Sequence, residues 1–227
     1  MDFKKDYINP YNTRFERVKF AVKQLIPFGL EDKRVLNIGG GGNRHLEKSL
    51  LELESNSSPF EIDMTGDNDL SLNLDKIDRL PFEDKEFDFC LLTDILEHLE
   101  NFHLILNECF RITKKALVVS LPIPSQEFTR IIYNRRYNSN GLNEGIYSKF
   151  YGLPFLVPED RHRWWFTYDD AISFFENFES HNDCKVSIFS DLPQVNGIQN
   201  KLWKFFLPKR IYRNLFYNAI WITIEKS

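Results

Sequence analysis

The N-terminal part of the chain carries a helical pattern of apolar and polar positions. Within residues 13–26, apolar side chains recur every three or four positions and share one helical face: Phe15, Val18, Ala21, Val22 and Leu25. Thr13 precedes this stripe and Glu16 lies three residues further on, which is the pattern of a capping box. We therefore expect a helix that begins after Thr13, within an N-terminal helical segment over residues 1–30.

Downstream, apolar runs of strand length alternate with segments of helical period. The strand-like runs cover residues 34–39, 60–64, 86–95, 116–122, 184–191 and 219–226. The helical segments cover residues 43–55, 95–113 and 167–178. Strand, helix and strand in succession predict an α/β fold with a mostly parallel sheet and crossover helices. The alternating run at the end of the chain predicts the final, antiparallel strand.

Two stretches interrupt this rhythm. Residues 122–165, after the fourth strand, are rich in Pro, Tyr, Arg and Asn, and we expect an inserted cap there. The end of the cap, residues 151–165, is too charged for a core and too aromatic for a free loop. It is either a wall that faces a substrate, with aromatics stacking on a ring and cations such as Arg163 meeting an anion, or a surface loop pinned by Trp164 and Trp165.

The second stretch, residues 192–217, is predicted to be a basic, aromatic helical insertion. Residues 198–218 contain several cations and no acid. Basic amphipathic helices of this kind lie on anionic membranes. The alternative is that the aromatic faces pack on the sheet while the cations extend into water.

Composition limits the classes of protein. A chain of 227 residues with 42% hydrophobic residues fits one domain, and a net charge of -4 argues against a general nucleic-acid binder. Three widely spaced cysteines indicate neither a disulfide framework nor a zinc site, and we expect no metal site. The sequence has no membrane-span-length apolar run and no signal-peptide pattern, so we expect a cytoplasmic protein, with peripheral contact at the inner membrane surface as a further hypothesis.

Four glycines follow the first predicted buried strand, in VLNIGGGGNRHL at residues 35–46. The dinucleotide pattern G-x-G-x-x-G fails here, because its last position falls on Arg44 or His45. A phosphate-binding Walker loop also fails, because no Lys-Ser or Lys-Thr pair follows. The cluster therefore indicates either a different ligand close to the backbone or a tight turn without any ligand.

Two motifs resemble the class I S-adenosylmethionine-dependent methyltransferases. The family's V-L-[DE]-x-G-x-G-x-G motif is matched at residues 35–43, with Asn37 at the acidic position and Asn43 at the third glycine. Residues 80–101, LPFEDKEFDFCLLTDILEHLEN, are similar to a second signature of the family. The resemblance covers about residues 33–121 and implies a Rossmann-like three-layer sandwich that binds S-adenosylmethionine.

The resemblance also implies which residues hold this cofactor. The turn at Asn37, Gly39, Gly40 and Gly41 would receive the methionyl end, because larger side chains would block it. Asp63 would bind the two ribose hydroxyls, with Glu61 as the second choice.

The remaining cofactor contacts implied by the resemblance come from residues further along the chain. Asp75 would contact the adenine amine, or Asp78 if the register differs. Thr93 and Asp94 would border the methyl-transfer cleft, since ligands bind beyond the carboxyl ends of parallel strands. A cap on the following helix is the alternative role for Thr93.

Catalysis in this family is mostly alignment, but an oxygen acceptor benefits from a general base. The candidates are His162, in the cap, and His98, in the second signature, where a packed histidine is the alternative. The tetrads typical of DNA amino-methyltransferases are absent, so we expect a small-molecule or glycan acceptor, a lipid-linked saccharide included, and no nucleic acid. The alternatives are a non-catalytic binding module with the same fold and, disfavoured by its missing fingerprint, a nucleotide-sugar oxidoreductase. The acceptor and the oligomeric state stay open.

Overall fold

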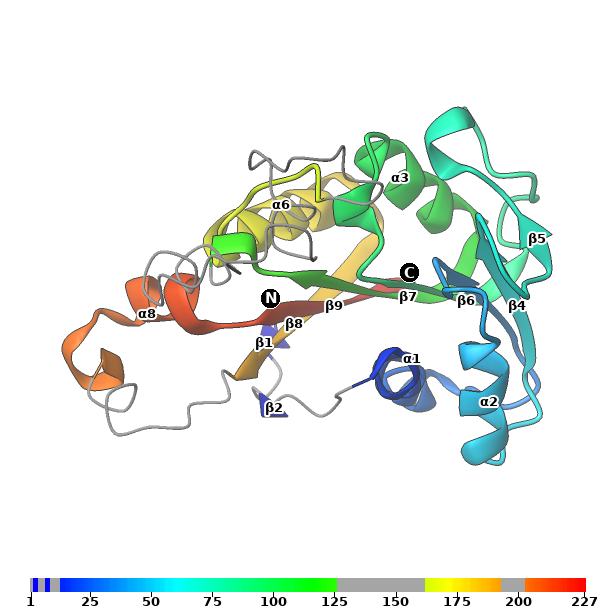
Figure 1. The fold of residues 1–227 in the computed structure, drawn as a ribbon, viewed down its shortest axis with the longest axis horizontal. Coiled ribbons are helices and arrows are strands. Elements are labelled where there is room, and N and C mark those ends of the chain that lie inside the picture. Colours follow the sequence, from blue (N-terminus) through cyan, green and yellow to red (C-terminus); the bar gives the residue numbers. More distant parts are fainter. Residues whose placement is uncertain (1, 4–6, 9–12, 126–161, 193–202) are drawn as a thin grey trace, which may run out of the picture.

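A mixed sheet organises the computed structural model, which describes residues 2–3, 7–8, 13–125, 162–192 and 203–227 (Figure 1). The strand order is β1-β8-β9-β7-β6-β3-β4-β5, and β2 pairs with β8. The strands are β1 (Asp2–Phe3), β2 (Tyr7–Ile8), β3 (Arg34–Ile38), β4 (Ser58–Asp63), β5 (Leu70–Ser71), β6 (Phe87–Thr93), β7 (Thr113–Pro122), β8 (Cys184–Leu192) and β9 (Ala219–Lys226). β9 runs antiparallel to β7 and β8, while the other pairs are parallel.

Helices cover both faces of this sheet, which gives the expected three-layer, Rossmann-like sandwich (Figure 1). α1 (Arg14–Lys23) and α2 (His45–Glu52) lie on one face. α3 (Phe102–Ile112) and α6 (Tyr168–His181) lie on the other, and α8 (Lys209–Phe216) contacts α6. The fold class predicted from the sequence is confirmed.

Alternation along the central strands divides the core between the two layers. On β3, Val35 packs with α1 and α2, whereas Leu36 and Ile38 pack with α3 and α6. On β9, Trp221 joins the first cluster and Ile222 joins the second. Since successive side chains of a strand point to opposite faces, one apolar run serves both cores.

The predicted capping box on the first helix is present. The Thr13 hydroxyl accepts a hydrogen bond from the Glu16 backbone N–H at 3.2 Å, and the Glu16 carboxylate accepts one from the Thr13 N–H at 3.2 Å. α6 begins with the same device, formed by Thr167 and Asp170. Reciprocal bonds of this kind satisfy N–H groups that have no partner inside the helix.

Two predictions of local structure are wrong. The segment 95–113 is not one helix: a 3-10 turn, η3 (Leu96–His98), is separated from α3 by the extended backbone of Leu99. The N-terminal segment 1–30 is not wholly helical, because β1 and β2 pair with β8. Such pairing depends on a strand more than 170 residues away, which a local pattern cannot reveal.

The two predicted insertions are described only in part. Residues 126–161 of the cap over 122–165 lie outside the described residues, as do residues 193–202 of the segment 192–217. Across the described ranges, no helix combines the length and the apolar character that crossing a membrane requires.

Candidate active site

The glycine turn after β3 has a left-handed backbone. Gly39, Gly41 and Gly42 have φ values of 77°, 76° and 62°. A Cβ on Gly39 would lie 2.7 Å from the Ile95 side chain, and one on Gly42 would lie 2.5 Å from the Thr65 carbonyl oxygen. A Cβ on Gly40 would collide with the Glu61 carboxylate. Close approach by the protein's own atoms therefore already requires glycine here, as in the alternative of a tight turn without a ligand that the sequence left open.

Glu61 lies against the turn and is bonded to Asn37, the residue at the acidic position of the first motif. It is the register partner of Asn37 on the neighbouring strand and is 1% exposed. Its carboxylate accepts hydrogen bonds from Asn37 Nδ2 at 3.2 Å and from the Leu46 N–H, at the start of α2, at 2.9 Å. Burial raises the pKa of Glu61, and these hydrogen bonds oppose the rise. Glu61 thus supports the turn from below, a role that its position as second choice for the ribose did not suggest.

Asp63 ends β4 beside the turn, as predicted. One carboxylate oxygen accepts the Gly41 N–H at 2.6 Å, and the other accepts the Met64 N–H at 2.7 Å. The oxygen that accepts the Met64 N–H also accepts the Thr65 N–H at 3.4 Å, whereas the oxygen bonded to Gly41 keeps a second lone pair for a hydroxyl group. The half-buried Asp63 side chain therefore fixes the turn and retains one acceptor position.

The next two expected contacts hold parts of the site together. Asp75 accepts the Glu100 N–H at 2.9 Å, just before α3, and its second oxygen lies 3.6 Å from Arg163 Nη2. Asp94, which follows β6 in a left-handed conformation with φ of 49°, forms an ion pair of 2.6 Å with Arg17 of α1. Both carboxylates thus connect separate segments around the strand ends.

Thr93 is the last residue of β6 and is buried. It does not cap η3, whose N-cap is Ile95 and has no side-chain cap. The alternative role predicted for Thr93, a helix cap, is therefore wrong. Thr93 does lie at the end of a parallel strand, where the sequence analysis expected it.

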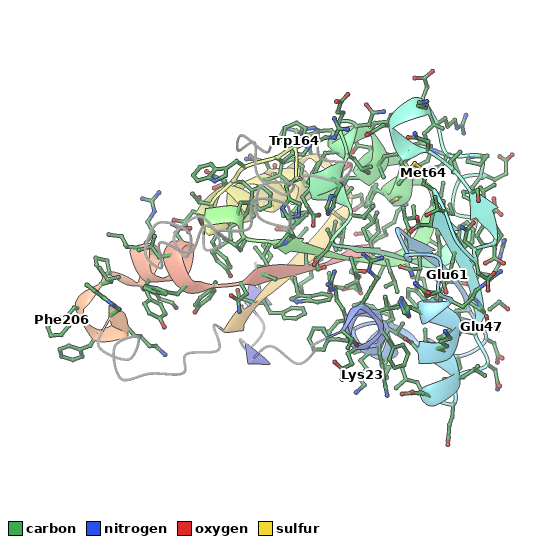
Figure 2. All side chains as sticks on the ribbon, in the orientation of Figure 1. Lys23, Glu47, Glu61, Met64, Trp164 and Phe206 are labelled. Atoms are coloured by element: carbon green, nitrogen blue, oxygen red, sulfur yellow. The ribbon has the colours of Figure 1, made fainter. Side chains whose placement is uncertain are left out.

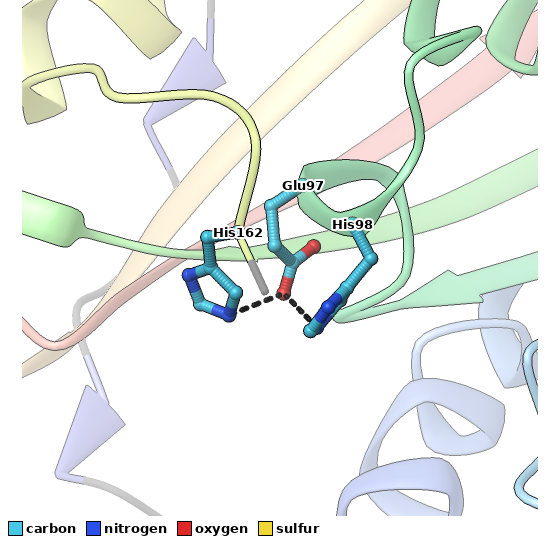
Figure 3. A group of neighbouring side chains, drawn as sticks. All are labelled: Glu97, His98 and His162. Atoms are coloured by element: carbon cyan, nitrogen blue, oxygen red, sulfur yellow. Dashed lines mark ion pairs between the residues drawn. The ribbon is translucent and has the colours of Figure 1, made fainter. Parts of the chain in front are cut away.

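The two candidate catalytic histidines meet at a third residue, Glu97, which sequence reasoning did not select. His98 and His162 point their Nε2 atoms toward one oxygen of Glu97, at 3.7 and 3.8 Å (Figure 3). The two rings are perpendicular, with centroids 4.6 Å apart. Glu97 is 0% and His162 is 4% exposed. The signal that could have revealed Glu97 is its place in the LEHL signature, beside His98.

The segment that carries His162 is bonded along the η3 turn. The Arg163 N–H donates to the Glu97 carbonyl at 2.7 Å, and Arg163 Nε donates to the His98 carbonyl at 2.8 Å. Trp164 Nε1 donates to the Leu99 carbonyl at 2.7 Å. Arg163 also pairs with Glu100 and lies near Asp75. These internal contacts agree with the alternative in which the segment is pinned to the protein surface, while contact of Arg163 with an anion of the substrate stays a prediction.

The basic segment near the C-terminus contains residues that contact the rest of the protein and residues that are exposed. Arg210 Nε and Arg213 Nε donate to Asp169 of α6 at 2.6 and 2.7 Å. Phe205 and Phe206, in contrast, are 83% and 69% exposed, and Phe206 points away from the sheet (Figure 2). Part of the basic charge thus fixes α8 to α6, while an aromatic pair is left at the surface of the described residues.

Comparison with known proteins shows which families part of the chain and its fold resemble. Residues 54–119 match the family described as "Methyltransferase domain". No curated protein sequence matches the chain. The fold is shared with many solved structures, and their low identity to this chain means that the likeness establishes the fold alone.

Three of these structures illustrate the degree of similarity. A proposed S-adenosylmethionine-dependent methyltransferase from Listeria monocytogenes has a TM-score of 0.55 and 12% identity, over 94% of this chain and 98% of that one. An S-adenosylmethionine-dependent methyltransferase from Methanosarcina mazei gives 0.53 and 15%, over 89% and 96%. The 1,6-didemethyltoxoflavin-N1-methyltransferase of Burkholderia thailandensis, solved with S-adenosylhomocysteine, gives 0.50 and 12%, over 93% and 78%.

The residues of the turn fit this cofactor class. Asn37 Oδ1 is buried and has no hydrogen-bond partner among the described residues, which leaves an acceptor at the position of the family's acid. A Cβ on Gly41 would collide with the Arg14 guanidinium, so a cation lies over the turn. Residues 54–119 thus match a methyltransferase domain, and the fold is one that solved S-adenosylmethionine-dependent methyltransferases share.

Proposed function

We propose that this protein transfers the methyl group of S-adenosylmethionine to an oxygen of a small-molecule or glycan acceptor. The observation that carries the proposal is that two polar clusters lie beyond the carboxyl ends of neighbouring parallel strands. The glycine turn and Asp63 follow β3 and β4, while Glu97, His98 and His162 gather just beyond β6. Ligands of α/β proteins bind beyond the carboxyl ends of neighbouring parallel strands.

The turn would hold the cofactor with the residues predicted from the sequence. The backbone of Gly39, Gly40 and Gly41 would lie against the methionyl end, and Arg14, whose guanidinium lies beside Gly41, would supply a cation for its carboxylate. Asn37 supports the amino end, directly or through a water.

The rest of the cofactor would follow the strand ends. Asp63 would accept the ribose hydroxyls and Asp75 would lie toward the adenine, with Thr93 and Asp94 along the cleft between cofactor and acceptor. The positions of Asp63 at the end of β4, of Thr93 at the end of β6 and of Asp94 directly after it support these roles.

An activated sulfonium supplies the methyl group, whose bond to sulfur breaks and leaves its electron pair on sulfur while the acceptor oxygen forms the new bond. The hydroxyl proton must then leave. We assign its removal to the histidines of the cluster, with His162 as the first candidate and His98 as the second. The Glu97 carboxylate, 3.7 and 3.8 Å from their Nε2 atoms, would stabilise the imidazolium that forms.

The surface around the cluster suits a ring-shaped acceptor. Trp165, close to His162 in the sequence, is 58% exposed and would stack on a sugar or another ring, whereas the Trp164 ring packs against Phe102 and His103. The exposed pair Phe205 and Phe206, together with the nearby Lys204 and Lys209, agrees with contact at an anionic membrane surface. We propose on this basis a cytoplasmic protein that can approach a lipid-linked saccharide at the inner face of the membrane.

Calorimetric titration with S-adenosylmethionine and with S-adenosylhomocysteine tests the proposal. We expect both to bind the wild type, and we expect Gly41→Val to lose binding, because a branched side chain resists the left-handed backbone and meets Arg14. A Gly29→Ala variant is the control, since Gly29 shares the left-handed backbone but a Cβ there meets nothing within 4 Å. If the folded wild type binds neither compound at millimolar concentration, the non-catalytic alternative replaces this proposal.

A further inference from the structure

We infer that Glu97, His98 and His162 form a binding site for a divalent transition-metal cation. Each residue offers one ligand atom, and the three atoms lie within 4.8 Å of one another (Figure 3). Two imidazole nitrogens and one carboxylate oxygen are a ligand set that binds Zn²⁺, Mn²⁺, Fe²⁺ and Co²⁺. The sequence alone does not reveal this ligand set, because His98 and His162 are far apart in the chain.

The distances within the cluster are those of an open site. The two contacts from histidine Nε2 to Glu97 Oε1, at 3.7 and 3.8 Å, exceed a normal hydrogen bond. Ligand atoms that surround a cation at about 2.1 Å lie roughly 3.0–3.5 Å from one another. A cation between the three side chains would therefore need only a small inward movement of the rings.

Burial adds an electrostatic reason for a cation. Glu97 has no exposed surface, and removing a carboxylate from water costs several kcal/mol, which nearby positive charge offsets. A divalent cation between the ligand atoms would place two positive charges against this carboxylate. Neutral imidazoles, the form in which histidine binds metals, would complete the ligand set without opposing that charge.

The cluster is also held in place by bonds that do not involve the ligand atoms. The Glu97 and His98 carbonyls accept from Arg163, and the Leu99 carbonyl accepts from Trp164. These bonds fix the segment of His162 against η3, so both sides of the site are positioned before any cation arrives. Metal sites gain affinity from such supporting bonds.

Three protein ligands leave coordination positions open, as in catalytic rather than structural metal sites. A divalent cation lowers the pKa of a hydroxyl that it contacts, which would ease the loss of the acceptor proton. In that case His162 acts as a ligand and not as the base. This catalytic role rests on the proposed methyl transfer, whereas cation binding at the site does not.

The test is a titration of the cofactor-free wild type with Zn²⁺, Mn²⁺ and Co²⁺ by calorimetry, with the visible absorption of Co²⁺ as a report on imidazole ligation. Ca²⁺, which prefers oxygen ligands, is the control cation. We expect one ion per chain for at least one of the three transition metals and weak binding of Ca²⁺. Failure of the wild type to bind any of the three at micromolar free metal would overturn the inference.

Variants locate the ion. His162→Asn, His98→Asn and Glu97→Gln should each weaken binding at least about tenfold, as loss of a ligand does, with circular dichroism to confirm folding. His181→Ala is the matched control, since His181 is an exposed histidine at the end of α6 and should bind as the wild type does. Equal binding by all three cluster variants would place the ion elsewhere and overturn the inference.

The same samples separate this inference from the proposed function. Binding of S-adenosylmethionine to a protein that takes up no cation would refute the metal site and leave the methyl-transfer proposal standing. A cation bound in the cluster of a protein that does not bind S-adenosylmethionine would support the site and refute the proposed reaction.

Discussion

The glycine turn and the histidine cluster occupy the same edge of the sheet, but they are built in opposite ways. The turn, residues 39–43, is one short stretch whose glycines are required by contacts with Ile95, Glu61, Arg14 and Gly66. The cluster joins Glu97 and His98 to His162, from a distant segment, through hydrogen bonds of Arg163 and Trp164. A local motif can therefore identify the first region, whereas only the folded chain creates the second.

The largest expected effect is on the turn itself. Gly42→Ala should lower the free energy of unfolding by more than about 3 kcal/mol, because its Cβ would lie 2.5 Å from the Thr65 carbonyl oxygen and 2.6 Å from the Gly66 Cα. Gly29→Ala, with the same backbone hand and no neighbour within 4 Å, should lose only about 1 kcal/mol. Urea unfolding of both variants measures the difference. If both variants lose the same free energy of unfolding, the left-handed backbone conformation, and not close packing, explains why these positions are glycine.

Cofactor affinity should separate the two regions. Asp63→Ala should weaken S-adenosylmethionine by about 2–4 kcal/mol, because the ribose loses a charged acceptor and Gly41 loses its partner. His162→Ala should stay within about 0.5 kcal/mol of the wild type, as expected for a change away from the cofactor. Calorimetry measures both. A large loss in His162→Ala would show that the two regions form one binding site.

The buried acid under the turn should give a pH dependence. Burial raises the pKa of Glu61 above its ordinary value, so the folded state binds its proton more tightly than the unfolded state does. This contribution to stability is present at low pH and is lost as the pH rises through the raised pKa. As the pH rises above the ordinary pKa range of a glutamate, the wild type should therefore lose stability relative to Glu61→Gln.

Urea unfolding of both proteins across this range measures that effect, with Glu47→Gln, an exposed acid on α2, as the control. A difference between wild type and Glu61→Gln that grows in favour of the wild type with rising pH would contradict a raised pKa for this carboxyl.

The smallest expected effects compare the capping boxes of the two helical layers. Thr13→Ala removes the cap of α1, on the side of the turn, and Thr167→Ala removes that of α6, which follows the segment of His162. Each should cost about 1 kcal/mol of stability. Thr167→Ala should also weaken cation binding if the start of α6 positions His162, and Thr13→Ala should not. If both variants change cation binding equally, the start of α6 has no special role in positioning His162.

Sequence patterns with short-range causes were predicted well. The capping box at Thr13, the strand at residues 219–226 and the position of Asp63 at the end of β4 all follow from side-chain period and local hydrogen bonding. The break before α3 was missed, because Asp75 helps to set it by accepting the Glu100 N–H from 25 residues away. Asp75 belongs to another segment, and no window around Leu99 contains it.

What the sequence by itself determined is the α/β class, the order of most elements and the glycine turn, since each depends on the period of apolar residues or on backbone freedom. What only the tertiary structure decided is the chemistry around that turn. Glu61 accepts a hydrogen bond from Asn37 because the two residues face each other across β3 and β4, and Glu97 meets two histidines because Arg163 binds the η3 carbonyls. Both arrangements arise from contacts between segments that are distant in sequence, and burial then sets the charge and hydrogen bonding of the groups that they bring together.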